Sequence, residues 1–290
     1  MTGTQGQEAM QYWRDVLKNP PPLLSLGDRT PPSPRRYEAD TVRAQFDGPL
    51  AQSLKDAARQ RGATLFQLLL TAVTAALRHI SGQDEFVVSI PYASQSLQRR
   101  GPLMADGVLD LPLRLQCQTT DTGTQLLSRV RDQLMDALEY PVATQGTVAR
   151  ALGLPSSGDR APFTGVFFNL NPRIDLSGFA PLTASMHEGR KRGTLSELFF
   201  NFYEGTEALT LDLHYSTEFF SPERAQSLVQ ALKSTCEQLA QSIDTPLSQL
   251  VATQPVKTNT QPLVVDPHLA AWNQTQAPFD PHARIEQWVT

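Results

Sequence analysis

The chain has 290 residues, of which 40% are hydrophobic, so it can form one large domain or two small ones with a substantial core. Its net charge of -4 leaves no basic surface for phosphate groups, and nucleic acid is not an expected partner. No apolar run approaches the roughly 20 residues that cross a bilayer, and the N-terminus lacks the features of a signal peptide. We expect a water-soluble, cytoplasmic protein without a membrane partner.

The first part of the chain predicts a helix, a connector and a strand. Residues 6–18 place Met10, Trp13 and Leu17 on one side of a helix, and the proline-rich residues 19–36 predict an extended connector. Residues 41–46 alternate polar and apolar side chains like a half-buried strand. Asp47 and Pro49 then open a second helix.

A long apolar helix and a buried strand follow. Thr64 and Gln67 have the spacing of a capping box, and Gly82 suits a left-handed helix end. The segment FVVSI predicts a strand buried on both faces, and Pro91, which has no N–H, is expected to end its ladder. Residues 108–117 predict another strand with Leu at every second position, where Pro112 indicates a bulge or an edge.

The second half continues the alternation of helices and strands. A helix is predicted at 123–139, a strand at 164–171, and a hairpin in which SELFFNFY and ALTLDLHYS flank the turn EGTE. Ser221 and Pro222 begin a long last helix. We therefore predict an α/β fold with a mixed β-sheet flanked by helices.

The sequence contains few signs of catalytic chemistry. It has no glycine-rich phosphate loop, GxSxG, CxxC or HExxH, and its five histidines are scattered. We expect no catalytic residue, no metal site and no bound cofactor. Cys117 and Cys236 lie on apolar faces, which indicates buried, reduced thiols.

A few polar residues are candidates for function. Asn169, Asn171 and Asn201 occur in apolar strands, where an amide needs a structural partner or a ligand in a substrate channel. Arg114 and Arg160 suggest structural ion pairs or functional contacts.

Asp212 and His214 share one face of a strand. They suggest an acid-base pair, although a solvated outer face explains them more simply.

Several stretches taken together resemble a known family. SGQDEFVVSIPYASQ, GPLMADGVLDLPLRL, SSGDRAPFTGVFFNLNP and LTLDLHYSTEFFSPERAQSLVQAL are similar, in this order, to motifs of condensation domains in nonribosomal peptide synthetases, which have the chloramphenicol-acetyltransferase-like fold. The resemblance covers about residues 10–250 and is strongest to the form found in hybrid polyketide/peptide synthetases. AAWNQTQAPFDPHARIEQWV is similar to the opening of an adenylation domain.

The resemblance implies a division of the chain into three parts. Residues 1–36 would form the N-terminal helix and connector, 37–250 the C-terminal lobe of a condensation domain, and 251–290 the linker and first residues of an adenylation domain. The HHxxxDG motif of the family's first lobe does not occur, and Leu109 replaces the Asn of the family's VNxLPLR strand, whereas Arg114 matches it.

Three functions remain open on this basis. The preferred hypothesis is a truncated, non-catalytic lobe that serves as a structural platform beside the adenylation domain, so that this chain alone is not an enzyme. The first alternative is half of an active amide-forming condensation domain, whose His-bearing N-terminal lobe is supplied upstream or in trans. The second is a docking module for a carrier domain, whose phosphopantetheine arm would contact the chain.

Overall fold

A computed structural model describes most of the first 249 residues. The described residues are 4–93, 108–141, 144–154, 160–179, 181–182, 184, 189–205 and 208–249. The chain divides into two compact units, residues 1–254 and 255–290, and every described residue belongs to the first. The predicted linker and adenylation start at 251–290, and the residues Ser94 and Gln95 after the second strand, lie outside the described residues.

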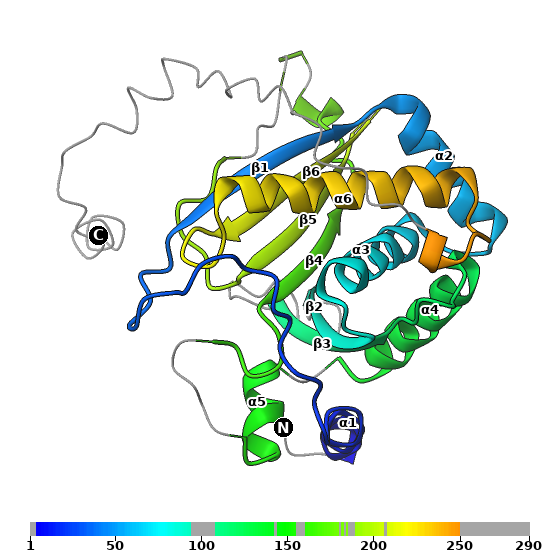
Figure 1. Cartoon of the computed structure of the whole chain (residues 1–290). Coiled ribbons are helices and arrows are strands. Elements are labelled where there is room, and N and C mark those ends of the chain that lie inside the picture. The colour runs from blue at the N-terminus through cyan, green and yellow to red at the C-terminus, as the bar shows by residue number, and fades with distance from the viewer. Residues whose placement is uncertain are drawn as a thin grey trace, which may run out of the picture. The chain divides into compact units, whose positions relative to one another are not determined.

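The described strands form one mixed sheet of six strands in the order β1-β6-β5-β4-β2-β3 (Figure 1). Strands β2, β4 and β5 are mutually parallel, and β1, β3 and β6 run antiparallel to their neighbours. The predicted α/β class with a mixed sheet is therefore confirmed. The strand bounds are β1 Ala39–Phe46, β2 Glu85–Ala93, β3 Val108–Gln116, β4 Val166–Asn171, β5 Leu198–Glu204 and β6 Leu209–Ser216.

Helices flank this sheet. Figure 1 shows α6 and α3 across one face of the sheet, and α1 and α5 near β3, at the end of the strand order away from β1.

No single helix in the described part of the chain is long and apolar enough to cross a membrane; α2 and α3 meet that requirement only as a pair, bent by 103°. The helix bounds are α1 Thr4–Val16, α2 Gly48–Gln60, α3 Leu65–Ser81, α4 Gly123–Glu139, α5 Gln145–Ala151 and α6 Pro222–Gln241, with short 3-10 helices η2 Ser177–Phe179 and η3 Leu247–Gln249.

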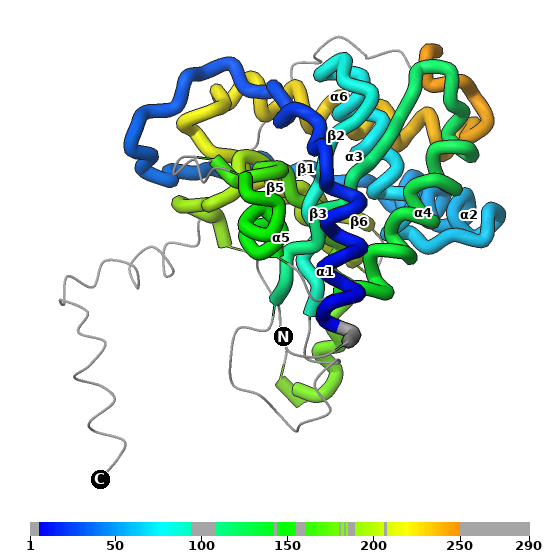
Figure 2. The backbone as a smooth tube through the Cα atoms, turned by 90° about the horizontal axis from the view of Figure 1, so that it is seen from below, coloured from blue at the N-terminus to red at the C-terminus, as the bar shows by residue number. Residues whose placement is uncertain are grey.

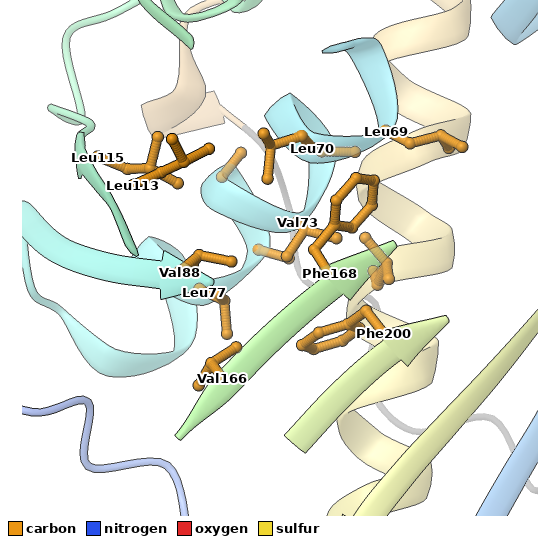
Figure 3. Close-up of a cluster of buried hydrophobic side chains, with 14 of the residues drawn as sticks. Leu69, Leu70, Val73, Leu77, Val88, Leu113, Leu115, Val166, Phe168 and Phe200 are labelled. Atoms are coloured by element: carbon orange, nitrogen blue, oxygen red, sulfur yellow. The ribbon is translucent and has the colours of Figure 1, made fainter. Parts of the chain in front are cut away.

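The core lies between α3 and the sheet. Leu70, Val73 and Leu77 of α3 point toward Val88 and Phe168 of the sheet (Figure 3), and all five side chains are fully or almost fully buried. This packing explains why the apolar stripe of α3 is so wide, since the helix is buried on most of its circumference.

The helix ends follow the predicted local chemistry. Thr64 accepts a hydrogen bond from the backbone N–H of Gln67, whose side chain accepts one from the backbone of Thr64, and Gly82 closes α3 with φ of 70°. Asp47 caps α2 and Ser221 caps α6. These short-range contacts need only neighbouring residues, which is why the sequence predicts them well.

One expectation about the strands differs from the structure, and one short helix was not predicted. Pro91 does not end β2, because β2 remains paired with β3 as far as Ala93 opposite Val108. The pairing of β2 with β4, by contrast, consists of Ser89 opposite Phe167, so the proline lies beyond the parallel ladder and not beyond the antiparallel one. Helix α5 was not predicted; its seven residues are too few for a clear apolar period.

Candidate functional site

Polar side chains gather on the sheet face turned away from α3. Because successive strand residues point to opposite faces, the burial of Phe168, Phe200 and Leu213 on the helical side places their neighbours on the other side. This second face, which we call the polar face, carries Thr41, Arg43, Asn169, Asn171, Phe199, Asn201, Tyr203, Asp212 and His214.

The three candidate asparagines meet in one cluster. Asn169 and Asn201 are directly opposite each other on β4 and β5. The Nδ2 group of Asn171 donates to Oδ1 of Asn201 at 2.8 Å and to the carbonyl of Phe202 at 3.0 Å, and Nδ2 of Asn169 donates to Oδ1 of Asn171 at 3.1 Å. We call Asn169, Asn171 and Asn201 the amide cluster. The Nδ2 group of Asn201 donates to the hydroxyl of Tyr203, so contacts within the cluster and with adjacent strand residues account for most of the hydrogen-bonding capacity of these amides.

A buried ion pair lies beside the amide cluster. Arg43 of β1 is opposite Asp212 of β6, and its Nε and Nη2 groups donate to the two carboxylate oxygens of Asp212, each at 2.6 Å. The Asp212 side chain is fully buried, whereas 29% of the Arg43 side chain is exposed. This bidentate contact offsets the free-energy cost of removing the Asp212 carboxylate from water.

His214 is also buried, at 1% exposure, and the expectation of a solvated outer face for Asp212 and His214 is wrong. The reason is that neighbouring side chains cover the imidazole. Its ring lies 6.0 Å from the ring of Phe199, and Nζ of Lys191 lies 4.9 Å from the centre of the same Phe199 ring. Asp212 and His214 have separate partners, since Nδ1 of His214 is 2.8 Å from Oγ1 of Thr41. The sequence did not indicate this partner.

The electrostatic environment keeps His214 neutral. Burial lowers the pKa of its imidazole to about 4, and the nearby cations Lys191 and Arg43 act in the same direction, against the carboxylate of Asp212. Its Nε2 atom is buried and has no hydrogen-bond partner among the described residues. A neutral imidazole can accept a proton, but this one is closed off from solvent, which makes it unsuited to acid-base work in this conformation.

Arg114 lies away from the amide cluster, on the edge strand β3. Its Nε and Nη2 groups donate to the carboxylate of Glu85 at 2.8 and 3.0 Å, and its Nη1 group donates to the carbonyl of Val16 in α1. The guanidinium thus joins β2, β3 and α1. The contact with Glu85 also holds the pKa of that carboxyl below its usual range.

Arg160 lies at the other end of β4 from the amide cluster. Its Nε and Nη2 groups each donate to the Glu197 carboxylate at 2.7 Å. The partner Glu197 comes directly before β5 and is 6% exposed. The structure therefore brings together the three candidate asparagines and places the two candidate arginines elsewhere.

Sequence reasoning missed several residues of these contacts, including Thr41, Arg43, Glu85 and Glu197. Arg43 alternates with the apolar Val42 and Ala44 on β1, a signal that could have marked it as facing the polar side. Glu197 gave no such signal, because its partner is 37 residues away. Within the described ranges no group of three or more His, Cys, Asp or Glu side chains could hold a metal ion.

Comparison with protein families identifies the fold. The model of the family described as "Condensation domain" matches residues 1–261. The chain belongs to the condensation-domain family. Its sheet and flanking helices accordingly resemble one lobe of the chloramphenicol-acetyltransferase-like fold.

Relatives of this condensation-domain chain are large synthetases. It is 27% identical over 240 residues to surfactin synthase subunit 1 of Bacillus subtilis, with 82% of this chain and 7% of that protein covered. It is likewise 27% identical over 270 residues to malpibaldin synthetase of Mortierella alpina, covering 92% of this chain and 5% of that protein. The chain thus spans less than a tenth of the length of these relatives.

Solved structures of low sequence identity share the fold. The X-domain in a complex with OxyB from teicoplanin biosynthesis superposes with a TM-score of 0.78 at 20% identity, covering 86% of this chain and 56% of that one. A four-domain nonribosomal peptide synthetase bound to AMP and glycine gives 0.76 at 18% identity, covering 89% of this chain and 21% of that one. The condensation domain of the monacolin K polyketide synthase gives 0.71 at 18% identity, covering 84% and 59%.

Proposed function

We propose that residues 37–250 are the C-terminal lobe of a condensation domain in a nonribosomal or hybrid polyketide/peptide synthetase, and that they act as a non-catalytic structural platform beside an adenylation domain. Residues 251–290 would be the linker and the first residues of that adenylation domain. The similarity to synthetases and to one part of solved condensation domains supports this assignment.

The observation that supports the platform role is that the polar side chains already have structural partners or are buried. The amide cluster is bonded internally, Arg43, Arg114 and Arg160 hold carboxylates, and His214 is buried and neutral. A residue that assists amide formation must reach the reacting amine with a group able to take its proton. These side chains instead connect strands and helices to one another.

The test is an amide-forming assay with the purified chain. Two carrier domains, one loaded with an acyl or peptidyl thioester and one with an aminoacyl thioester, are mixed with the chain, and the product is followed by mass spectrometry. We expect no product above the rate without the chain. Amide formation by this chain without any further lobe would refute the platform role.

The same assay distinguishes the platform role from the first alternative, in which the chain is half of an active condensation domain. A lobe bearing HHxxxDG, taken from the same gene or from a related synthetase, is added in trans. Product formation only with both lobes would assign these residues to an active domain whose His-bearing lobe lies elsewhere. No product with both lobes would favour the platform.

Docking of a partner protein is a second candidate, because the X-domain with the same fold forms a complex with OxyB. For this chain the partner would be a carrier domain with its phosphopantetheine arm. A fluorescence titration with the modified and the unmodified carrier tests this. Saturable binding that depends on the arm would support docking, and no binding would count against it.

A further inference from the structure

A loop of the connector, residues 29–38, is attached at both ends to the turn between β6 and α6. The backbone N–H of Arg29 donates to the carbonyl of Phe219 at 3.1 Å, and the carbonyl of Glu38 accepts from the backbone N–H of Thr217 at 3.1 Å. Figure 2 shows the connector in dark blue as it runs from α1 to β1 in a wide loop. These contacts fix both ends of the loop relative to the turn.

A buried ion pair strengthens this attachment. The Nε group of Arg35 donates to the carboxylate of Glu218 at 3.2 Å, and only 2% and 4% of the two side chains are exposed. The same guanidinium lies 4.8 Å from the ring centres of both Tyr37 and Phe219. The Glu218 carboxylate also accepts from the backbone N–H groups of Arg36 and Tyr37, at 2.5 and 3.1 Å. Its charge and its acceptor capacity are therefore used within the protein.

The backbone of the loop is strained at Tyr37. This residue has a φ of 61°, in the left-handed region that is unfavourable for a residue with a bulky side chain. Its N–H donates to Glu218, and its carbonyl accepts from the N–H of Thr194 at 2.9 Å. Strain that the surroundings maintain in this way is concentrated at functional sites, so the loop is a candidate for one.

The loop and the turn border an open hollow of about 500 Å³, a volume within the range of small-molecule sites. Arg35 neutralises Glu218, and the Asp28 carboxylate, which is not a lining group, accepts from the N–H and hydroxyl of Ser221. Two guanidiniums and the carboxylate of Glu38 remain, which leaves one net positive charge. The lining residues are Arg29, Thr30, Pro32, Arg36, Glu38, Thr217 and Glu218.

The free hydrogen-bonding side chains of the hollow are mostly donors. Arg29 uses one N–H of Nη1, which donates to the carbonyl of Thr217 at 2.9 Å. The side chain of Arg36 and the hydroxyls of Thr30 and Thr217 have no partner among the described residues. The Glu38 carboxylate is not within ion-pair distance of either guanidinium. Arg29, Thr30, Arg36 and Glu38 are all exposed, so a ligand can reach them.

This set of donors fits a phosphate group better than a carboxylate. Guanidinium groups donate in pairs to the oxygens of either anion. Two guanidiniums and two hydroxyls, however, offer more donors than the two oxygens of a carboxylate can accept. A phosphate monoester has three terminal oxygens and a charge of roughly −2 near neutral pH.

We propose that this hollow binds the phosphate group of a small phosphate monoester, with Arg29 and Arg36 as its donors. The carboxylate of Glu38 opposes the bound anion and limits its affinity. The site is independent of the proposed platform role, since none of its groups belongs to the amide cluster or to the contacts of His214. Its occupancy can therefore be tested without any synthetase assay.

The probe is ethyl phosphate, compared with propionate, which is a carboxylate with an alkyl group of the same length. Both are titrated into the full chain at constant ionic strength and about pH 7.5, where the phosphate is mostly a dianion. Nuclear magnetic resonance of the backbone and arginine N–H groups follows binding. We expect saturable binding of ethyl phosphate and at least about fivefold weaker binding of propionate. No saturable binding of ethyl phosphate, or propionate binding as tight, would overturn the proposal.

Three variants test the residues. Arg36→Gln should weaken ethyl phosphate binding at least about fivefold, whereas Glu38→Gln should strengthen it at least about twofold. The matched control, Arg150→Gln, removes an exposed arginine of α5 that also lacks a partner among the described residues, and should leave the affinity unchanged. Equal weakening by the two arginine changes would show a general attraction of anions and would refute the site, as would weaker binding by Glu38→Gln. All three positions are exposed, so the core stays intact.

Discussion

Single polar residues decide how the sheet responds to pH. His214 is buried in the folded protein with its pKa lowered to about 4, below the ordinary imidazole value of 6.5. Between these two pH values the unfolded chain binds a proton that the folded chain does not bind. The free energy of unfolding should therefore fall as the pH decreases from about 6.5 to about 4.

The variant His214→Gln should remove this fall in the free energy of unfolding at low pH. Glutamine can still reach Thr41 and does not take up a proton, so the pH-dependent contribution of about 3 kcal/mol should disappear. Urea unfolding at pH 7, 6, 5 and 4.5 measures it. The control His79→Gln changes an exposed histidine on α3 and should keep the wild-type pH dependence. The same steep fall in both variants would contradict the assignment.

At the scale of elements, close backbone approaches hold the strands of the sheet in register. Gly165 precedes β4, and its carbonyl accepts hydrogen bonds from the backbone N–H groups of Glu197 and Leu198 at the start of β5. A Cβ atom at position 165 would lie 2.5 Å from Cγ of Glu197. Only glycine leaves room here for the Glu197 side chain that binds Arg160.

The variant Gly165→Ala should therefore destabilise the protein by about 2 kcal/mol, because the added methyl group displaces a buried ion pair. The matched control is Gly146→Ala in α5, where an added Cβ meets nothing within 4 Å and alanine favours the helix. We expect an unchanged or slightly higher midpoint of urea unfolding for the control. Equal midpoints of the two variants would show that the space at position 165 is not restricted.

At the scale of the whole molecule, one core accounts for the described unit. The buried apolar residues from all six strands and from α1 to α6 form a single cluster. This unit comprises residues 1–254. A domain that buries its own core can fold without a partner.

A chain that ends at Gln254 should consequently unfold at the same temperature as the full chain, within about 2 °C. Circular dichroism during heating measures both. A fall of more than about 5 °C would mean that residues 255–290 contribute to the stability of the first unit. The full chain with the conservative change Thr290→Ser serves as the control for purification.

The sequence by itself determined the elements of this protein. Apolar periods and caps such as Thr64, Asp47 and Ser221 predicted the long helices and strands, and the order of several motifs indicated the condensation-domain family. The periods and caps depend on residues close together in the chain, and the motif order is read along the sequence itself, so neither requires the tertiary structure. The seven residues of α5 and the continuation of β2 past Pro91 were missed, because the first is too short for a period and the second depends on which neighbouring strand is paired.

Only the tertiary structure decided what the polar residues do. The amide cluster joins β4 to β5, Arg43 binds an aspartate 169 residues away, and His214 is buried although its strand alternates like a half-solvated one. Burial of a sheet face depends on which side chains and segments lie over it, and these come from parts of the chain far apart in sequence, such as Phe199 and Lys191 near His214. Local patterns therefore predicted which side chains share a face, whereas the tertiary packing over that face determined whether it meets water.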